Sequence, residues 1–262
     1  VIIQAAKENK NNDIKSNIHH VSQTIRVDIN RLDNFMNLVS ELVIYRTRLE
    51  DIAGKLNNNE LNEPLEQVAR ITSDLQDLVL KIRMEPVNVV FNRFPRMIRD
   101  LSKQLDKDIE LIIEGEETEL DRTVVSELGE PLIHLIRNAA DHGVERKEER
   151  LAKGKVEKGI IKLTAYQEGN RVIIIVGDDG KGIAPETIRE SAIRKGIDVS
   201  GLDGKELIQL IFHQGFSTAQ EVTDVSGRGV GMDVVRQKIN GLGGTIEVES
   251  EVDKGTDFII RL

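Results

Sequence analysis

Asp178-Asp179-Gly180-Lys181-Gly182 follows an apolar run that ends at Val176, so a carboxylate stands at a strand end with two glycines after it. Asn138 lies upstream, and Gly227-Arg228-Gly229-Val230-Gly231 lies downstream. A helical amide, an Asp-led glycine turn and a second glycine-rich loop, in this order, suit the binding of a nucleotide. The turn would meet the base, the amide a metal ion and the glycine-rich loop the phosphates.

The composition limits the class of protein. The chain has 262 residues, enough for one large domain or two modest ones, and a net charge of −9 that argues against a general nucleic-acid binder. It has no cysteine and no apolar run of the roughly 20 residues that a membrane span needs. We therefore expect a soluble, cytoplasmic protein with no nucleic-acid partner and no membrane insertion. Because it starts at Val1, we also expect it to be part of a longer protein.

The N-terminal part predicts a helical hairpin. Residues 1–20 include a polar stretch at 7–13 and are interpreted as a linker, and residues 21–86 are interpreted as a helical dimerisation domain. Helical periodicity covers about 24–56 and 65–82, and the apolar stripe on each helix is too wide for two helices alone to cover. Two copies would cover it as a four-helix bundle of two antiparallel hairpins, and packing on the chain's own C-terminal domain is the alternative. The first stripe contains Phe35, Leu38, Leu42, Tyr45, Leu49 and Ile52.

Residues 87–262 alternate between helical and strand periods. Helices beside antiparallel hairpins predict an α/β sandwich in which helices cover one mixed sheet, so the whole chain is of the α+β class. The expected helices are 88–105, 122–142, 186–195, 205–212 and 232–240, and the expected strands are 109–113, 160–166, 171–176, 245–249 and 257–262.

His134, Asn138 and His142 stand at positions i, i+4 and i+8 and so share one face of the expected helix. Mg²⁺ keeps several waters and takes few protein ligands beside substrate phosphates. The neutral amide of Asn138 can ligate such an ion without adding negative charge beside a triphosphate. The alternative is that these side chains only cap the helix near Gly143.

Asp178 can accept a hydrogen bond from the exocyclic amine of adenine, a bond worth roughly 1.5–3 kcal/mol. Gly180 and Gly182 would let the backbone lie close to the ring, and the hydroxyl of Thr256 would approach the base. An acidic hairpin turn or a calcium loop is the alternative. The calcium loop is disfavoured because the alternating acidic ligands of an EF-hand do not follow.

Ser226-Gly227-Arg228-Gly229-Val230-Gly231 runs directly into an apolar helix. The backbone N–H groups of such a loop, together with the helix N-terminal dipole, bind phosphates. It is neither a Walker loop, because no Gly-Lys-Ser/Thr follows, nor a dinucleotide fingerprint, because the spacing is Gly-x-Gly-x-Gly. A flexible surface loop is the alternative.

The ordered set resembles the N, G1, F, G2 and G3 boxes of the Bergerat-type ATPases, which include sensor histidine kinases, DNA gyrase B, MutL and related chaperones. Phe212 and Phe216 match the F box. Within that superfamily the chain resembles the bacterial chemotaxis histidine kinases over nearly its whole length. The segments that carry this resemblance are Gly129-Glu130-Pro131-Leu132-Ile133-His134-Leu135-Ile136-Arg137-Asn138, Asp141-His142-Gly143-Val144-Glu145, Gly215-Phe216-Ser217-Thr218, Ser226-Gly227-Arg228-Gly229-Val230-Gly231-Met232-Asp233-Val234-Val235, Lys81-Ile82-Arg83-Met84 and Phe91-Asn92-Arg93-Phe94-Pro95-Arg96.

The resemblance implies a Bergerat fold over 87–262 that binds ATP and Mg²⁺. Asn138 would help to coordinate the Mg²⁺ with His134 near it, and these two are the candidate catalytic residues. Gyrase-type ATPases carry a catalytic Glu one turn before the Asn, where this chain has His134, and a histidine that faces a metal favours phosphoryl transfer over hydrolysis. The implied ATP-binding residues are Asn138, Asp141, His142, Asp178, Gly180, Gly182, Ser226, Gly227, Arg228, Gly229, Gly231, Met232 and Thr256.

The phosphoryl acceptor implied by the resemblance is a histidine on a separate phosphotransfer domain. His19 and His20 lie in the expected linker, and neither an acidic residue nor a proline follows them as in ordinary sensor kinases. We therefore expect this chain to bind ATP and form a homodimer but not to phosphorylate itself. The resemblance also implies a receptor, a coupling protein and response regulators as partners. A gyrase-type ATPase clamp and a dimeric scaffold with a non-catalytic nucleotide site are the alternatives.

Overall fold

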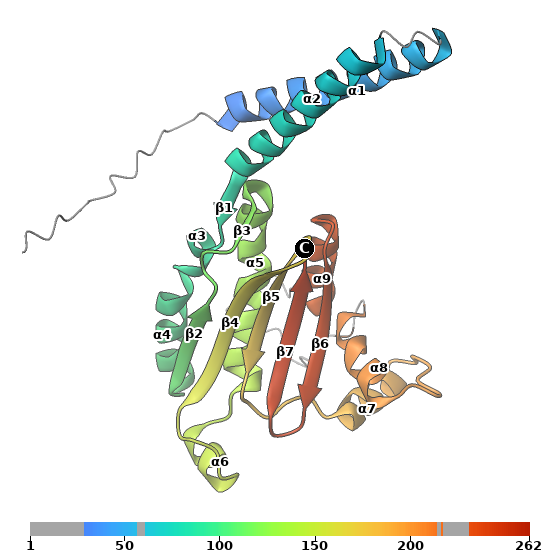
Figure 1. Ribbon diagram of the computed structural model, residues 1–262. Coiled ribbons are helices and arrows are strands. Elements are labelled where there is room, and N and C mark those ends of the chain that lie inside the picture. The colour runs from blue at the N-terminus through green and yellow to red at the C-terminus, as the bar shows by residue number, and fades with distance from the viewer. Residues whose placement is uncertain (1–28, 57–60, 214–215, 217–230) are drawn as a thin grey trace, which may run out of the picture. The chain divides into compact units, whose positions relative to one another are not determined.

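The computed structural model describes residues 29–56, 61–213, 216 and 231–262. The chain divides into two compact units, Val1–Gln76 and Asp77–Leu262, and each is described by itself. The helix α1 (Ile29–Leu56) lies in the first unit, and α2 (Asn62–Arg83) starts in the first unit and ends in the second (Figure 1). The part of the first expected helix that precedes residue 29 lies outside the described residues.

Within the first unit, Arg46 links the two helices. Its Nη1 donates to the carbonyl oxygen of Ala69 at 3.2 Å and to Oγ of Ser73 at 3.4 Å. Most large apolar side chains of this unit remain exposed, as expected for a hairpin whose stripes a further surface must cover. They are Phe35, Leu38, Leu42, Ile44, Tyr45, Leu49, Ile52, Leu61, Val68 and Ile71.

The second unit is built on one five-stranded sheet with the order β2-β4-β5-β7-β6. The first pair, β2 and β4, is parallel, and the other neighbours are antiparallel, which confirms the expected mixed sheet. The short strands β1 and β3 form a separate antiparallel pair. The bounds are β1 Met84–Pro86, β2 Ile109–Glu114, β3 Glu119–Asp121, β4 Gly159–Glu168, β5 Arg171–Asp178, β6 Thr245–Glu251 and β7 Gly255–Arg261.

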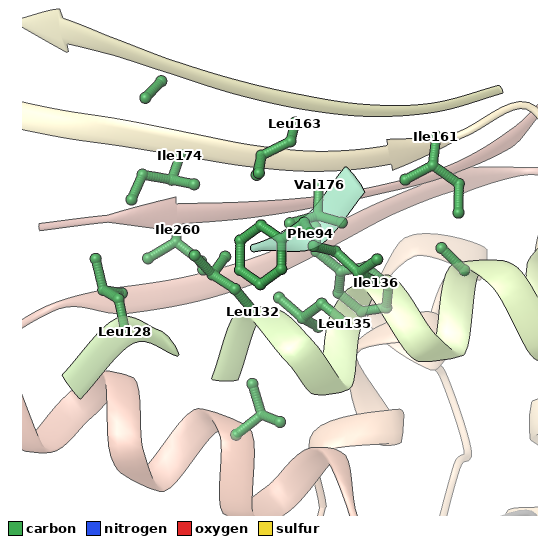
Figure 2. Packing of buried hydrophobic residues seen from close by; sticks show 14 of the residues in the cluster. Phe94, Leu128, Leu132, Leu135, Ile136, Ile161, Leu163, Ile174, Val176 and Ile260 are labelled. Carbon is green, nitrogen blue, oxygen red and sulfur yellow. The ribbon is translucent and has the colours of Figure 1, made fainter. Parts of the chain in front are cut away.

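Helices α4 (Phe94–Leu105), α5 (Arg122–Asn138) and α9 (Met232–Gly241) lie on one face of this sheet (Figure 1). Side chains of α5, including Leu132 and Leu135, are fully buried and face Leu163, Ile174 and other strand residues (Figure 2). Each such side chain contributes roughly 1.5–3 kcal/mol by leaving water. This core fixes the C-terminal end of α5 against the end of β5.

A second, smaller apolar cluster lies among the helices that follow β5. It joins α7 (Pro185–Arg194) and α8 (Gly204–Gln209), and α8 also contacts β6. Phe216, one of the two F-box residues, is buried in this cluster, whereas Phe212 packs edge-on against Phe258 in the main core, with ring centroids 6.3 Å apart. The two F-box phenylalanines therefore belong to different apolar clusters.

The structure differs from the expected elements in several places. The helix expected at 88–105 is two helices, α3 (Asn88–Phe91) and α4, because Pro95 lacks an N–H donor and favours the first turn of a new helix. The helix expected at 122–142 is α5 followed by the π-helical turn η2 (Ala139–Gly143). Helix α8 continues into the 3₁₀ turn η3 (Leu210–Phe212). The short strands β1 and β3 and the short helix α6 (Lys147–Ala152) were not expected.

Candidate functional site

The C-terminal half of α5 carries His134 and Asn138. Burial lowers the pKa of His134, and neighbouring Arg137 and Lys238 act in the same direction, while Glu130 opposes them. The imidazole is therefore neutral at pH 7, and its nitrogen lone pair is available. Asn138 donates from Nδ2 to Sδ of Met232 at 3.6 Å, which leaves its Oδ1 without a partner among the described residues.

After Asn138 the helix widens into the π-helical turn η2. Lys107 binds this turn by donating from Nζ to the carbonyl oxygens of Ala140 (2.9 Å), Asp141 (2.6 Å) and Val144 (2.8 Å). Three acceptors match the three donors of an ammonium group. Single π turns inside helices often occur at functional sites, and here the turn brings Gly143 to the sheet, since η2 contacts β5 and β7.

Gly143 meets the carboxyl group of Asp178 at the end of β5. A Cβ on Gly143 would lie 2.8 Å from Cγ of Asp178, which is closer than any side chain allows. The N–H of Gly180 donates to Oδ1 of Asp178 at 2.9 Å, and the N–H of Lys181 donates to the carbonyl oxygen of Gly143 at 3.0 Å. Oδ2 of Asp178 has no partner among the described residues and is free to accept from a ligand.

Two further glycines close the turn against β7. Gly182 has φ +67°, and a Cβ there would lie 2.2 Å from the carbonyl oxygen of Glu251. Gly255 has φ +127°, and a Cβ there would lie 1.8 Å from the carbonyl oxygen of Asp178. Both positions therefore require glycine.

Thr256 pairs with Asp178 in the β5–β7 register and is buried. Its Oγ1 lies 2.8 Å from Oγ of Ser250, which also donates to the carbonyl oxygen of Gly255 and accepts from the N–H of Ile183. In the arrangement that satisfies all three contacts, the Thr256 hydroxyl donates to Ser250 and keeps lone pairs for a further donor.

Burial raises the pKa of Asp178 to about 6. The N–H of Gly180 opposes this shift, and the carboxylates of Asp179, Asp257 and Glu145 add to it. A carboxylate that is buried at a cost in free energy and lacks a cationic partner is characteristic of a binding site.

The structure brings together some of the residues expected from the sequence and leaves others apart. Asp178, Gly180, Gly182 and Thr256 lie together with Gly143. Asn138 lies against Met232, and Gly231 is the residue before α9. Asp141 and His142 are exposed, with Nε2 of His142 3.7 Å from Oδ2 of Asp141. The expected residues Ser226, Gly227, Arg228 and Gly229 lie outside the described residues, as do His19 and His20.

Two side chains that organise this region were not expected from the sequence. Lys107 supports η2, and Arg150 binds Asp179 directly behind Asp178. Both stand in highly charged segments without a helical or strand period, where one buried cation cannot be distinguished from its exposed neighbours.

Within the described ranges, no set of three His, Cys, Asp or Glu side chains is close enough to hold a metal ion. In the same ranges, no helix has the length and apolar character needed to cross a membrane.

Comparison with known proteins identifies two family models. Residues 22–82 match the model of the signal transducing histidine kinase, homodimeric domain. Residues 125–262 match the model of the histidine kinase-, DNA gyrase B-, and HSP90-like ATPase, which covers more than half of the chain. A solved structure, the catalytic domain of the histidine kinase ThkA, is 19% identical, with a TM-score of 0.45 over 68% of this chain and 93% of that chain.

Curated relatives resemble the chain closely. Chemotaxis protein CheA of Bacillus subtilis is 54% identical over 245 residues, and sensor histidine kinase CheAY of Helicobacter pylori is 52% identical over 254 residues. Each alignment covers 92% of this chain but only 36% and 32% of the respective relatives. The chain belongs to the histidine kinase-, DNA gyrase B- and HSP90-like ATPase family, and nearly all of it aligns with chemotaxis histidine kinases of the CheA type.

Proposed function

We propose that this chain is the ATP-binding and dimerisation core of a chemotaxis histidine kinase, which transfers the γ-phosphoryl group of ATP to a histidine on a separate phosphotransfer domain. The main support is the partly buried carboxyl group of Asp178, which has one free oxygen and lies between Gly143 and Gly180. The match to CheA proteins at 54% identity supports the same function.

Adenine is the base that fits this carboxyl group. Its exocyclic amine donates to an ionised Asp178, whereas guanine presents a carbonyl oxygen at the corresponding position and is repelled. The glycines at 143, 180 and 182 keep side chains away from the carboxyl group, so a flat ring can approach it. The hydroxyl of Thr256 retains lone pairs beside the carboxyl group and would complete the recognition of the base.

Mg²⁺ would be held by Asn138 together with the phosphates. The donor set fits, because Nδ2 of Asn138 is occupied by Met232 while Oδ1 has no partner among the described residues. An amide oxygen is a suitable ligand for Mg²⁺, and few protein ligands are needed when phosphates take part. When bound, the ion would neutralise the negative charge of the β- and γ-phosphates.

The side chains of this site would act by positioning. Phosphoryl transfer needs an in-line acceptor more than covalent help from the protein. His134 lies one turn before Asn138 and is neutral at pH 7, so it adds no charge and acts as a hydrogen-bonding group or metal neighbour. A carboxylate in its place would be a stronger base toward water, as in gyrase-type ATPases. Histidine at this position therefore favours an acceptor on a second domain over water.

We also propose that the chain forms a homodimer through its first unit. The exposed apolar residues of α1 and α2 form the surface, and the match of residues 22–82 to a homodimeric domain supports the pairing. By the same resemblance, the phosphotransfer domain, a receptor, a coupling protein and response regulators are the proposed partners of the whole kinase. A dimer of this kind would exist without nucleotide, unlike an ATP-driven clamp.

The affinity for ATP, measured with and without Mg²⁺ on wild type and Asn138→Ala, tests the proposal. We expect Mg²⁺ to strengthen binding in wild type and to have little effect in the variant. Asn240→Ala, which makes the same change at an exposed position of α9, should behave as wild type. Phosphate transfer to an added phosphotransfer domain of a CheA relative should also fall in Asn138→Ala. Equal Mg²⁺ dependence in both proteins would contradict the role of Asn138, and an absence of ATP binding in wild type would contradict the function.

A further inference from the structure

Arg150 is the most deeply buried charged side chain in the described part of the chain. It belongs to α6, a six-residue helix that is otherwise mostly exposed, yet only 1% of its side chain is accessible. An arginine is rarely buried to this extent unless its charge is paired and its five N–H groups are all bonded. The contacts of Arg150 meet both conditions.

The guanidinium group binds Asp179 with both of its terminal nitrogens. Nη2 donates to Oδ2 of Asp179 at 2.7 Å, and Nη1 donates to Oδ1 at 3.0 Å. Nη1 also lies 3.3 Å from Oε2 of Glu145. Nε and Nη2 donate to the carbonyl oxygens of Val156 and Lys158 at 2.8 and 3.2 Å. The two-pronged contact with Asp179 fixes that carboxylate in angle as well as in distance.

A second cation, Lys155, binds the backbone of the same turn. Its Nζ donates to the carbonyl oxygens of Asp179 at 2.8 Å and Gly180 at 2.6 Å, and to Oε1 of Glu145 at 3.0 Å. Arg150 and Lys155 balance the carboxylates of Glu145 and Asp179, and Lys153, which lies 3.5 Å from Glu145, is balanced by Asp253. The network is therefore neutral and attaches the backbone of 179–180 to the segment 145–158.

Neighbouring residues of the turn point in different directions. The carboxylate of Asp179 accepts from Arg150 and from the N–H of Ile160 at 2.9 Å. The carboxyl group of Asp178 lies against Gly143 and keeps one oxygen free. Since Asp178 and Asp179 are joined by one peptide unit, holding the carboxylate and the carbonyl oxygen of Asp179 also limits the direction of Asp178.

Stability alone does not account for this network. Breaking a buried ion pair destabilises a protein, but well-packed apolar side chains often stabilise as much as the pair did. Apolar side chains in the same place would not fix the direction of the backbone and carboxylate of the turn. In this protein the fixed turn is the one that carries Asp178.

We propose that Arg150 is a positioning residue that sets the base specificity of the nucleotide site, by holding Asp179 and through it the direction of the Asp178 carboxyl group. This proposal rests on the function proposed above, because it assumes that Asp178 binds adenine. Arg150 itself does not touch the nucleotide.

Arg150→Lys is the test, because lysine keeps the charge but loses the two-pronged contact. The dissociation constants of ATP and GTP are measured by competition against a fluorescent ATP analogue. We expect ATP affinity to fall about tenfold, as for the loss of one well-aligned charge-assisted hydrogen bond, while GTP affinity changes by less than about threefold. The control Arg146→Lys makes the same change at an exposed residue one turn earlier and should leave both constants unchanged.

The outcomes separate the two proposals. If wild type does not bind ATP, the proposed function fails and this inference fails with it. Suppose that wild type prefers ATP while Arg150→Lys keeps the same ratio of ATP to GTP affinity, either because neither affinity changes or because both fall equally. In that case only the inference is overturned. If Arg150→Lys does not fold, Asp179→Asn decides, because it breaks the two-pronged contact from the other side while an amide oxygen can still accept from the N–H of Ile160. A smaller preference for ATP over GTP in that variant supports the inference, and an unchanged ratio of ATP to GTP affinity overturns it.

Discussion

The Asp178 carboxyl group and Gly143 are in direct contact, so that a Cβ on Gly143 would lie 2.8 Å from Cγ of Asp178. One residue belongs to the π-helical turn after α5, and the other ends β5. The carbonyl oxygen of Gly143 also accepts from the N–H of Lys181. This contact joins the helical segment with Asn138 to the glycine turn with Asp178, which are two separate motifs in the sequence.

Gly143→Ala should therefore weaken nucleotide binding with little loss of stability. The added methyl group must displace the Asp178 carboxyl group, because the two cannot occupy the same space. We expect ATP affinity to fall by about tenfold or more, which corresponds to the loss of one charge-assisted hydrogen bond. Isothermal titration with Mg-ATP measures this. Gly241→Ala is the control, since a Cβ there meets nothing within 4 Å, and unchanged affinity in Gly143→Ala would contradict the role of the contact.

Asp178→Asn should stabilise the protein while weakening ATP binding. Burial raises the pKa of Asp178 from 3.8 to about 6, so the folded state binds a proton more tightly than the unfolded state. Folding is thus favoured at low pH, and this contribution is lost as the pH rises from about 4 to 6. At pH 7 the ionised carboxylate costs at most about 3 kcal/mol, at 1.36 kcal/mol per pKa unit.

Urea denaturation across this pH range measures the effect. We expect the variant to be more stable than wild type at about pH 7 and the difference to disappear near pH 4. ATP affinity of wild type should fall below about pH 6, where the carboxyl group is protonated, and Asp178→Asn should lack that dependence. If Asp178→Asn is less stable than wild type at pH 7, the ionised carboxylate of Asp178 does not reduce the free energy of unfolding as proposed.

The periodic elements could be predicted from the sequence. All five strands of the main sheet were located, because apolar runs between turn residues specify them, and the core helix was located through its helical apolar period. The short pair β1 and β3 could not be located, since three residues carry no period and their pairing depends on the core around them. The π turn after Asn138 was read as ordinary helix because its residues continue the helical period, and Lys107, which binds its carbonyl oxygens, is distant in the chain.

Within the candidate site, the residues that belong to sequence motifs could be predicted, and the residues that support them could not. Asp178, Gly182 and Thr256 were proposed from the sequence, and they lie together in the structure. Arg150 and Lys107 were missed because the residues of the site that they bind, Asp179 and the η2 turn, are 29 or more residues away in the chain. Only the folded structure distinguishes these buried cations from the many exposed ones nearby.

Lys107→Met should disturb η2 and the residues that it carries. The substitution keeps most of the side-chain volume but leaves the carbonyl oxygens of Ala140, Asp141 and Val144 without their shared donor. We expect a loss of about 1–3 kcal/mol in the free energy of unfolding, together with weaker binding of Mg-ATP. Urea denaturation and titration measure the two effects. Lys103→Met, at an exposed position of α4, should change neither, and normal ATP binding by Lys107→Met would show that the turn keeps its shape alone.

Ile71→Glu should convert the proposed dimer into a monomer. The side chain of Ile71 is 65% exposed within one copy of the chain, although it is large and apolar, and a second copy would bury it. A charge in such an interface loses its water and finds no partner, which costs several kcal/mol. Gln76→Glu is the control, since it adds the same charge on an exposed side chain about 140° around the helix from Ile71. Sedimentation with and without ATP should give a dimer for wild type and Gln76→Glu, and a monomer for Ile71→Glu. A wild-type dimer that forms only with ATP would instead favour the gyrase-type clamp, because the hairpin surface is present whether or not nucleotide is bound.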